Sequence, residues 1–396
     1  MARDMMALGR VGATSLVAVV SVVVLVGCGP SETERLDEQW ANLGVPEAEF
    51  VFLGDLTPGE QQAIRRELRI AQVVFMEHFG AVTSDFTVYV STDLDLLNER
   101  VAVEPGGSAL DSACNGIAVR TGVFLVIEEC PDTDDFGQIL AHEYFHMLQY
   151  DAGTLMGSAQ GGLRWTVEGS AVYAAALFNE AQGRRTLAAL RQGKQLAWAA
   201  GHIEGARFAY DYGFLATDWL AERAGTEAVL KYFRLGGHRA AFEAAFGMSL
   251  AAFNSEFEAH RADVARPFEW RVAGTVLGGD GAPIEGVHVY AVVRIEGEAW
   301  GAGTGETGPK GTFEFPAPGS GYTIAIWLQC PRDEGMDEWV RAGEWGEDGF
   351  LVDEDGIGDR REKGAEPFAD GKRDRTDLVI EIPETRDSLV AKHCEV

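Results

Sequence analysis

The sequence predicts an α+β protein, in which a small N-terminal sheet and a long helical region precede a separate all-β unit. Three observations carry this prediction. Residues 85–91 and 123–127 are rich in β-branched and aromatic residues, as strands are. Residues 136–266 are Ala/Leu-rich segments broken by single glycines, which is typical of successive helices. After Pro267 the chain changes to short alternating runs separated by Gly, Pro and Asp, as in β-sandwiches.

The composition excludes one class of partner. The chain has 396 residues, with 62 acidic and 33 basic side chains, and its formal net charge is −29. Binding nucleic acid needs clustered Lys and Arg to neutralise phosphates, so no nucleic-acid partner is expected. Hydrophobic residues make up 46% of the chain, which is enough to bury a core. At about 100–200 residues per domain, the length predicts two folded units.

The N-terminus has the layout of a secretory signal. Residues 1–27 combine a basic start with an apolar run over Val11–Val26, which is shorter than the roughly 20 residues that span a bilayer. The end of this run, Leu25–Cys28, resembles a bacterial lipobox, which implies that Cys28 is lipidated and becomes the first residue of the mature protein. An uncleaved membrane anchor is the alternative. Gly29, in place of an Asp, favours an outer-membrane or cell-surface location.

The remaining chain divides into a spacer and two domains. Residues 28–45 are polar and acidic and predict a spacer. The first domain covers 46–266 and opens with a helix over 58–80. The second covers 267–396. Its segments GTV…DGAPIEGVHVYA and GTFEFPAPGSGYTIAI resemble the carboxypeptidase regulatory-like β-sandwich family, which implies an accessory domain without an active site of its own.

Apart from Cys28, the chain has four cysteines in an exported and therefore oxidising setting. We predict disulfides between Cys114 and Cys130 and between Cys330 and Cys394, because each pair then closes within one domain. A cysteine metal site is the alternative, but no two of these residues lie at CxxC-like spacing.

The helical region contains a pattern with metal-binding chemistry, His142-Glu143-Tyr-Phe-His146. Residues four apart in a helix lie about 40° from each other around the axis, so both imidazoles face the same side. Two neutral imidazoles there can hold one Zn²⁺, and Glu143 can take the proton of a water at the metal. The apolar neighbours of both histidines indicate a buried helix rather than an exposed, charged turn.

A catalytic zinc site needs a third protein ligand. Glu168, in the segment Trp165-Thr-Val-Glu168-Gly-Ser-Ala, is the main candidate, and Glu180 is the alternative. HExxH followed by WxxEGxA resembles the gluzincin metallopeptidases. This resemblance implies a mainly helical peptidase domain in which Glu168 completes a two-histidine, one-glutamate site.

The resemblance continues along the chain. A Tyr-x-x-Gly helix start at 210–213 and the later helices resemble the C-terminal half of the peptidase MA-like branch of gluzincins, so that the match covers most of 136–265. It implies that a tyrosine here donates a hydrogen bond to the oxyanion of the reaction. Tyr210 fits this position and Tyr212 is the alternative, while a third possibility is that both are core aromatics.

These features predict a zinc metallopeptidase with one Zn²⁺ per chain, a peptide or protein substrate, and a membrane attachment through Cys28. A surface protein that binds without cleaving, and a zinc hydrolase of non-peptide amides or esters, are the alternatives. We also expect the strand Val123–Ile127 to pair with an extended substrate. The chain lacks the Gly-x-Met-x-Asn-like segment by which aminopeptidases of this clan recognise a free amino terminus, which favours an endopeptidase.

One further segment is rich in oxygen ligands. Asp353–Asp359 has spacing suggestive of Ca²⁺ but lacks the downstream Glu of an EF-hand loop. We interpret it as a solvated acidic loop, with a calcium site as the alternative.

Overall fold

The computed structural model describes residues 32–110, 114–127, 133–153, 163–199, 203, 208–265, 270–318, 321–330, 338–346, 349–352, 367, 375–383, 385 and 388. The predicted signal segment 1–27, Cys28, Cys130, Cys394 and Asp353–Asp359 lie outside the described residues, as do the side chains of Cys114 and Cys330. The lipidation, disulfide and calcium hypotheses therefore stay predictions.

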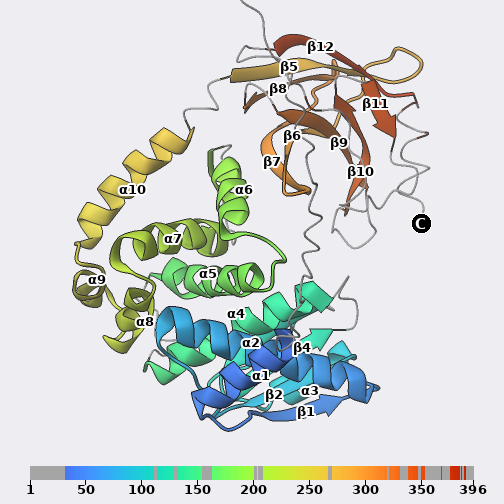
Figure 1. Ribbon diagram of the computed structural model, residues 1–396. Helices are drawn as coiled ribbons and strands as arrows, with labels where there is room; N and C mark the ends of the chain where they lie inside the picture. The colour runs from blue at the N-terminus through green and yellow to red at the C-terminus, as the bar shows by residue number, and fades with distance from the viewer. Residues whose placement is uncertain are drawn as a thin grey trace, which may run out of the picture.

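The N-terminal part is a small sheet with helices on both faces (Figure 1). Its elements are α1 (Glu32–Leu43), β1 (Glu49–Leu53), α2 (Pro58–Phe79), β2 (Thr87–Ser91), α3 (Leu94–Val101), β3 (Cys114–Val119) and β4 (Gly122–Ile127). The strand order is β1-β2-β4-β3, in which the first three strands are parallel and β3 runs antiparallel to β4. β2 and β4 are the strands that the sequence predicts.

Residues 32–43 correct one expectation, because they form helix α1 where the sequence predicts a spacer. Leu36 is buried, and the Trp40 indole N–H donates a hydrogen bond to Gln72 of α2 over 2.7 Å. The Arg69 guanidinium lies 4.7 Å from the centre of the Trp40 ring. A helix needs only one apolar stripe to dock, so a segment that is polar and acidic on average can still pack against a core.

Helix α2 begins and ends close to where the sequence predicts, and it supports the helix of the HExxH segment. Thr57 and Glu60 form a capping box at its start, and Gly80, with φ of 61°, closes its end in the left-handed region. The Phe75 ring stacks on Tyr144 with centroids 5.5 Å apart. This aromatic contact joins α2 to α4 inside the core.

The helical region follows the sheet, as the sequence predicts. Its elements are α4 (Thr133–Asp151), α5 (Arg164–Ala181), α6 (Leu187–Ala199), the π-helical turn η2 (Phe208–Tyr212), α7 (Gly213–Ala224), α8 (Glu227–Arg234), α9 (Arg239–Phe246) and α10 (Leu250–Ala265). α4 and α5 pack against each other, and α5 also contacts η2 and α7. The elements that bear the candidate site residues thus lie together in one core.

The C-terminal part consists of two sheets with a core of their own. Its strands are β5 (Trp270–Leu277), β6 (Val287–Ile295), β7 (Glu298–Glu306), β8 (Thr312–Ala317), β9 (Tyr322–Cys330), β10 (Glu338–Gly346), β11 (Gly349–Val352) and β12 (Arg375–Glu381). One sheet has the order β11-β10-β9-β6-β7 and the other β12-β5-β8. α10 ends at Ala265 and β5 begins at Trp270, on either side of the predicted change at Pro267. The predicted α+β fold class is confirmed.

The two parts meet at α6, which contacts β6 and β7 and lies between α7 and the sheets in Figure 1. Leu196 and Ala199 of α6 pack against the sandwich core, whereas Trp300 of β7 packs against the core of the helical region. Each side therefore contributes apolar surface to the other.

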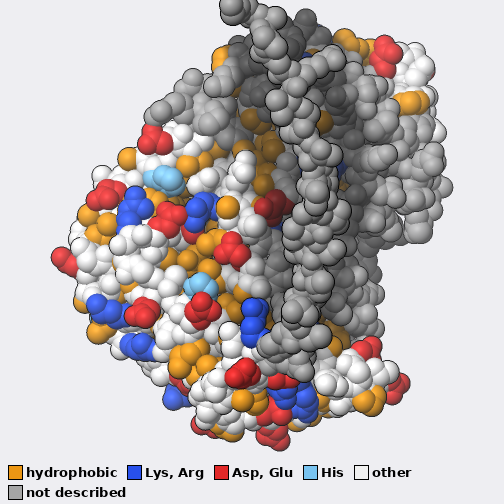
Figure 2. All heavy atoms as spheres, viewed as in Figure 1, with side chains coloured by type: hydrophobic (Ala, Val, Ile, Leu, Met, Phe, Trp, Pro, Cys, Tyr) orange, Lys and Arg blue, Asp and Glu red, His pale blue; other side chains and the backbone are white. Residues whose placement is uncertain are grey.

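On the described part of the face in Figure 2, Asp and Glu lie interspersed with Lys and Arg over the helical region. None of the helices in the described part of the chain has both the length and the apolar character needed to cross a membrane.

Candidate metal centre

Helix α4 brings His142 and His146 onto one side, one turn apart. Their Nε2 atoms are 3.2 Å apart and their ring planes make an angle of 84°. His146 is only 3% exposed, while His142 is partly open to solvent. The helix lies in the core because residues on its other sides are apolar and buried, among them Leu140, Ala141, Tyr144, Phe145 and Leu148.

Helix α5 supplies the third group. Oε2 of Glu168 lies 3.6 Å from Nε2 of His142 and 3.5 Å from Nε2 of His146. All three potential ligand atoms lie within 4.8 Å of one another. Zn²⁺ with bonds of about 2.0–2.1 Å in tetrahedral geometry separates its ligand atoms by about 3.3 Å. The three distances fit that geometry, and three protein ligands leave one position open.

The charges around these residues favour a cation. Burial alone would raise the pKa of Glu168, but hydrogen bonds from His142 and His146 hold it well below its ordinary value, so the carboxylate stays ionised. Burial alone would lower the pKa of His146. The hydrogen bond with Glu168 and the negative charge of Glu143 outweigh that effect and raise the pKa to about 9. The surroundings thus stabilise positive charge at the point where the three side chains meet.

The alternative ligand, Glu180, does not reach this point. It lies more than three turns beyond Glu168 on α5, which at 1.5 Å per residue is about 18 Å along the helix axis. Its Oε1 instead accepts a hydrogen bond from the backbone N–H of Leu187 over 2.9 Å, at the start of α6. Glu168 is therefore the carboxylate that joins the two histidines.

Gln149, to which the sequence analysis assigns no function, orients His146. Its Oε1 lies 2.8 Å from Nδ1 of His146, and its Nε2 donates to the Val167 carbonyl over 3.0 Å and to the Ser170 hydroxyl over 2.9 Å. Because Nδ1 donates to the amide oxygen, Nε2 of His146 is left free to bind a metal. Gln149 is fully buried. Its position one turn after His146 was the only feature of the sequence that could have indicated this role.

Glu143 lies on α4 next to His142 and is 7% exposed. Strand β3 passes directly beside it at Gly116, where an added Cβ would lie 2.8 Å from Cγ of Glu143. The glycine therefore allows the strand to approach the carboxylate closely.

Of the two candidate tyrosines, Tyr210 is the one at the site. Its ring stacks on His142 with centroids 6.1 Å apart and an interplanar angle of 23°. Burial, together with the charges of Glu168 and Glu143, raises the pKa of Tyr210 to about 12, so the hydroxyl keeps its proton at neutral pH. Tyr212 instead packs among aromatic side chains, with Phe208 at 4.2 Å and Phe257 at 5.4 Å. The π-helical turn, a feature often found at functional sites, carries both residues.

A family of known proteins matches this part of the chain. The collagenase family model, Peptidase_M9, matches residues 102–260, which include His142, His146, Glu168 and the groups beside them. The matched stretch thus contains a two-histidine, one-glutamate cluster at zinc-ligand spacing. This part of the chain is therefore similar to a zinc metallopeptidase of the collagenase family.

Solved structures overlap with this chain only in part. An M1 zinc metallopeptidase from Deinococcus radiodurans is 16% identical, with a TM-score of 0.31, over 55% of this chain and 46% of that chain. Legionella pneumophila aminopeptidase A in complex with aspartic acid is 15% identical, with a TM-score of 0.33, over 68% and 33%. This chain spans less than half the length of either structure. None of the curated proteins compared with it matches.

The edge strand beside the candidate metal site is β3 in the described part of the sheet, which corrects the expectation for Val123–Ile127. That segment, β4, lies between β2 and β3, so both of its sides are paired and it cannot accept a further strand. Among the strands that the structure describes, only β4 pairs with β3. The Tyr150 hydroxyl, from α4, lies 3.4 Å from the Ala118 carbonyl of β3, so strand and ligand helix are also joined directly.

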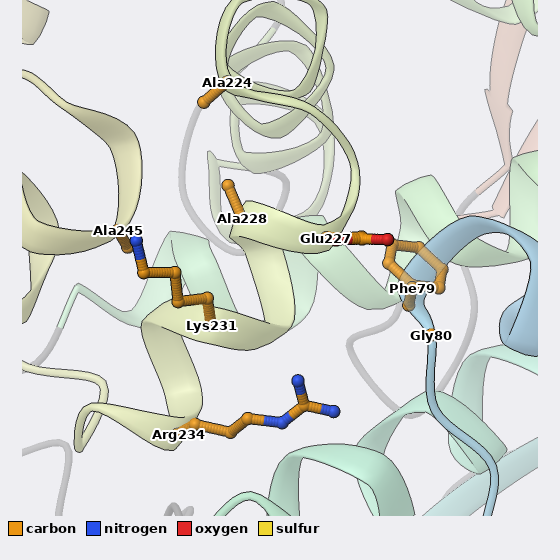
Figure 3. Close-up of a pocket in the computed structure, with 8 residues that line it drawn as sticks. All are labelled: Phe79, Gly80, Ala224, Glu227, Ala228, Lys231, Arg234 and Ala245. Carbon is orange, nitrogen blue, oxygen red and sulfur yellow. The ribbon is translucent and has the colours of Figure 1, made fainter.

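A separate hollow of about 450 Å³ lies between α8 and the ends of α2 and α7 (Figure 3). Lys231 and Arg234 line it together with Glu227, Phe79 and small residues. None of the metal-site residues borders it, and its charged groups, one carboxylate and two cations, do not form a set of zinc ligands.

Proposed function

We propose that the chain is an exported, lipid-anchored endopeptidase that hydrolyses peptide bonds at the His142, His146 and Glu168 site. The observation that carries this proposal is the placement of Glu143 and Tyr210 beside the three ligands. A ligand set alone could hold a structural ion. A buried carboxylate and a protonated phenol next to it are the groups that hydrolysis requires.

Each residue has a distinct role in this proposal. Zinc, when bound, polarises the substrate carbonyl and lowers the pKa of a water molecule toward about 7. Glu143 takes a proton from the attacking water and returns it to the leaving amine. Tyr210 keeps its proton at neutral pH and donates a hydrogen bond to the developing oxyanion. Gln149 holds the His146 ring with Nε2 toward the other two ligands.

The edge of β3 is a suitable place for the substrate backbone. In the described part of the chain no further strand pairs with its outer side, where an extended peptide can be added, and Gly116 brings the strand against Glu143. A peptide paired there lies beside the general base. An extended backbone is also what distinguishes a peptide from a small amide or ester, so this edge supports peptide hydrolysis over the alternative reactions.

The sequence of the edge strand supports internal cleavage. β3 and β4 contain no Asp or Glu, so neither strand offers a carboxylate for a substrate's free amino terminus. The chain also lacks the Gly-x-Met-x-Asn-like segment of aminopeptidases upstream of His142. Both features favour an endopeptidase.

Export and anchoring are proposed from the sequence. The signal layout of residues 1–27 and the lipobox-like end at Cys28 direct the chain across a membrane and attach a lipid. Cys28→Ser should move the protein from the membrane fraction to the soluble exported fraction, and an unchanged membrane fraction would reject lipidation at this residue.

The enzymatic part is tested with purified protein and a defined mixture of peptides, whose products are identified by mass spectrometry. The wild type should contain about one zinc per chain and cleave within the peptides. His146→Ala should lose both metal and cleavage, whereas Glu143→Gln should keep zinc and lose at least about 100-fold in kcat. Glu180→Gln is the matched control on α5, and it should retain both properties.

Three outcomes would overturn parts of the proposal. Full zinc occupancy in His146→Ala would reject the ligand set. A zinc-loaded wild type that cleaves no peptide would reject the peptidase assignment and favour a binding protein. Turnover restricted to non-peptide amides or esters would favour the other hydrolase.

A further inference from the structure

The hairpin β6–β7 of the sandwich has an unusual turn. Ile295 pairs with Glu298, so Glu296 and Gly297 form the two-residue turn. Their φ angles are 51° and 86°, and Glu296 is the one non-glycine with positive φ in the part of the chain that the structure describes. Such turns favour Asn, Asp or Gly at these positions. A glutamate in the left-handed region is conformationally disfavoured, so the contacts of the Glu296 side chain are of interest.

The Glu296 carboxylate is held at the start of α6. It accepts hydrogen bonds from the Thr186 backbone N–H over 3.2 Å and from the Thr186 hydroxyl over 2.8 Å. Thr186 is the residue that caps α6, since its hydroxyl also accepts from the Ala189 N–H over 3.0 Å. A negative charge at this helix end is favourable because the N-terminus carries the positive pole of the helix dipole.

Trp300, on the second strand of the hairpin, rests on the backbone of α6. A Cβ added to Gly193 would lie 2.1 Å from Cδ2 of Trp300, so only glycine leaves room for the indole. The Arg185 guanidinium lies 5.9 Å from the centre of the same ring. The hairpin therefore fixes α6 at its start, through Glu296, and along its length, through Trp300.

Lys194, which follows Gly193 on α6, connects this helix to the active site through one ion pair. Lys194 forms an ion pair with Asp211, and the two side chains are only 13% and 19% exposed. Asp211 follows Tyr210 in the π-helical turn. Lys194 also lies 5.6 Å from the centre of the Phe214 ring. Since the pair is largely withdrawn from water, a displacement of α6 would leave Asp211 with an unpaired charge.

Farther from Tyr210, Arg191 joins α6 to the helix that follows the turn, α7. The Arg191 guanidinium of α6 donates to Asp218 of α7 over 2.9 Å and pairs with Glu222 over 2.8 Å. α6 is thus attached to α7 on one side and to the sandwich on the other.

We propose that the β6–β7 hairpin is a positioning element of the active site: through α6 and the Lys194–Asp211 ion pair, it holds the turn that presents Tyr210 to the zinc ligands. The inference rests on the proposed function of Tyr210. In this proposal the sandwich contributes to catalysis by positioning Tyr210. Trp300, Glu296 and Lys194 are then positioning residues that touch no substrate.

The proposal differs from simple domain docking in what it expects of Trp300→Ala. Docking alone predicts a less stable sandwich with an unaltered active site. Positioning predicts a selective loss of kcat, of about 10-fold, because small misplacements of a catalytic group are costly. KM should stay within about twofold and zinc content should remain at one per chain, since the hairpin contacts described above lie at α6 and not on the ligand-bearing helices α4 and α5.

The experiment measures kcat, KM, zinc content and amide hydrogen exchange of the full mature chain. Trp300→Ala and Glu296→Gln should speed exchange in 208–213 as well as in 187–199. Lys194→Met should lower kcat to a similar extent, and Lys194→Arg should restore most of it. In the double variant of Trp300→Ala with Lys194→Met, the losses should not multiply, because both changes interrupt the same connection.

Phe313→Leu is the matched control, a buried aromatic of the sandwich core that lies on β8, in the other sheet. It should lower sandwich stability without changing kcat or exchange in 208–213. Equal effects of Phe313→Leu and Trp300→Ala, or multiplying losses in the double variant, would overturn the proposal. The exchange measurement is independent of turnover, so an inactive wild type would refute the peptidase function while the coupling of the hairpin to 208–213 is still decided.

Discussion

Gly169 of α5 and Gly213 at the start of α7 meet backbone to backbone. A Cβ added to Gly169 would lie 2.0 Å from the carbonyl carbon of Gly213, and one added to Gly213 would lie 2.8 Å from Cα of Gly169. Glu168 directly precedes the first glycine, and Tyr210 lies one turn before the second. The crossing therefore brings a zinc ligand and the candidate oxyanion donor, which are distant in sequence, to the same place.

Gly213→Ala should consequently damage both stability and the site. The added methyl group would also lie 2.3 Å from the Trp165 carbonyl, and backbone atoms on both sides leave no space for it. We expect the free energy of unfolding to fall by about 2 kcal/mol or more, with a loss of kcat. Urea unfolding and peptide cleavage measure the two effects. Gly59→Ala, on the exposed first turn of α2, is the control and should be neutral or slightly stabilising.

The crossing also explains which parts of the site the sequence reveals. His142, Glu143 and His146 are recognisable because one helix carries them and its period alone places them together. The contact between Gly169 and Gly213 and the support of His146 by Gln149 depend on how separate helices pack. No local pattern encodes those contacts, so the Trp-x-x-Glu-Gly and Tyr-x-x-Gly segments are recognisable only through their resemblance to a family.

The two corrections in the fold have different causes. α1 is polar on average, and only its contact with α2 through Leu36 and Trp40 shows that it belongs to the core. For β4 a signal was available. Val123–Ile127 is an uninterrupted apolar run without alternation, which is typical of a strand buried on both faces and paired on both sides. The prediction that this segment pairs with a substrate, which requires an edge strand, was therefore wrong.

His260 of α10 should make the stability of the protein depend on pH. Burial, followed by the positive charge of Arg223, lowers the pKa of His260, although Glu222, Asp263 and Asp218 act in the opposite direction. As the pH falls, the unfolded chain therefore protonates this histidine near pH 6.5, whereas the folded chain protonates it only at a lower pH. His260 therefore lowers the free energy of unfolding as the pH falls from about 6.5 through the folded-state pKa of this residue. Above that range its titration has no effect on stability.

His260→Gln removes this contribution. Between pH 7.5 and 5.0 the variant should lose less unfolding free energy than the wild type, as measured by urea denaturation at each pH. His78→Gln, on α2, serves as the control for general loss of a histidine. Parallel pH curves for the wild type and His260→Gln would contradict the assignment.

Gln149→Leu tests the support of His146. Without the amide oxygen, Nδ1 of His146 has no acceptor in the core and the ring loses its fixed orientation. We expect zinc affinity to fall by about 10- to 100-fold, as measured by competition with a chromophoric chelator. Ser170→Ala, which removes only a partner of the Gln149 amide, should have a smaller effect. Equal zinc affinity in Gln149→Leu and the wild type would show that the ring is held by other contacts.

Tyr210→Phe and Tyr212→Phe form a matched pair on one π-helical turn. Each change removes a single hydroxyl and keeps the ring, so the aromatic packing of the turn is preserved in both. Tyr210 faces His142, and loss of its hydroxyl should lower kcat by about 100- to 1,000-fold while zinc content stays at one per chain. Tyr212 packs against Trp165 and Trp198 away from the ligands, so its variant should keep kcat close to that of the wild type. Comparable losses in both variants would place the role of the turn in its packing, and a loss confined to Tyr212→Phe would reverse the assignment of the oxyanion donor.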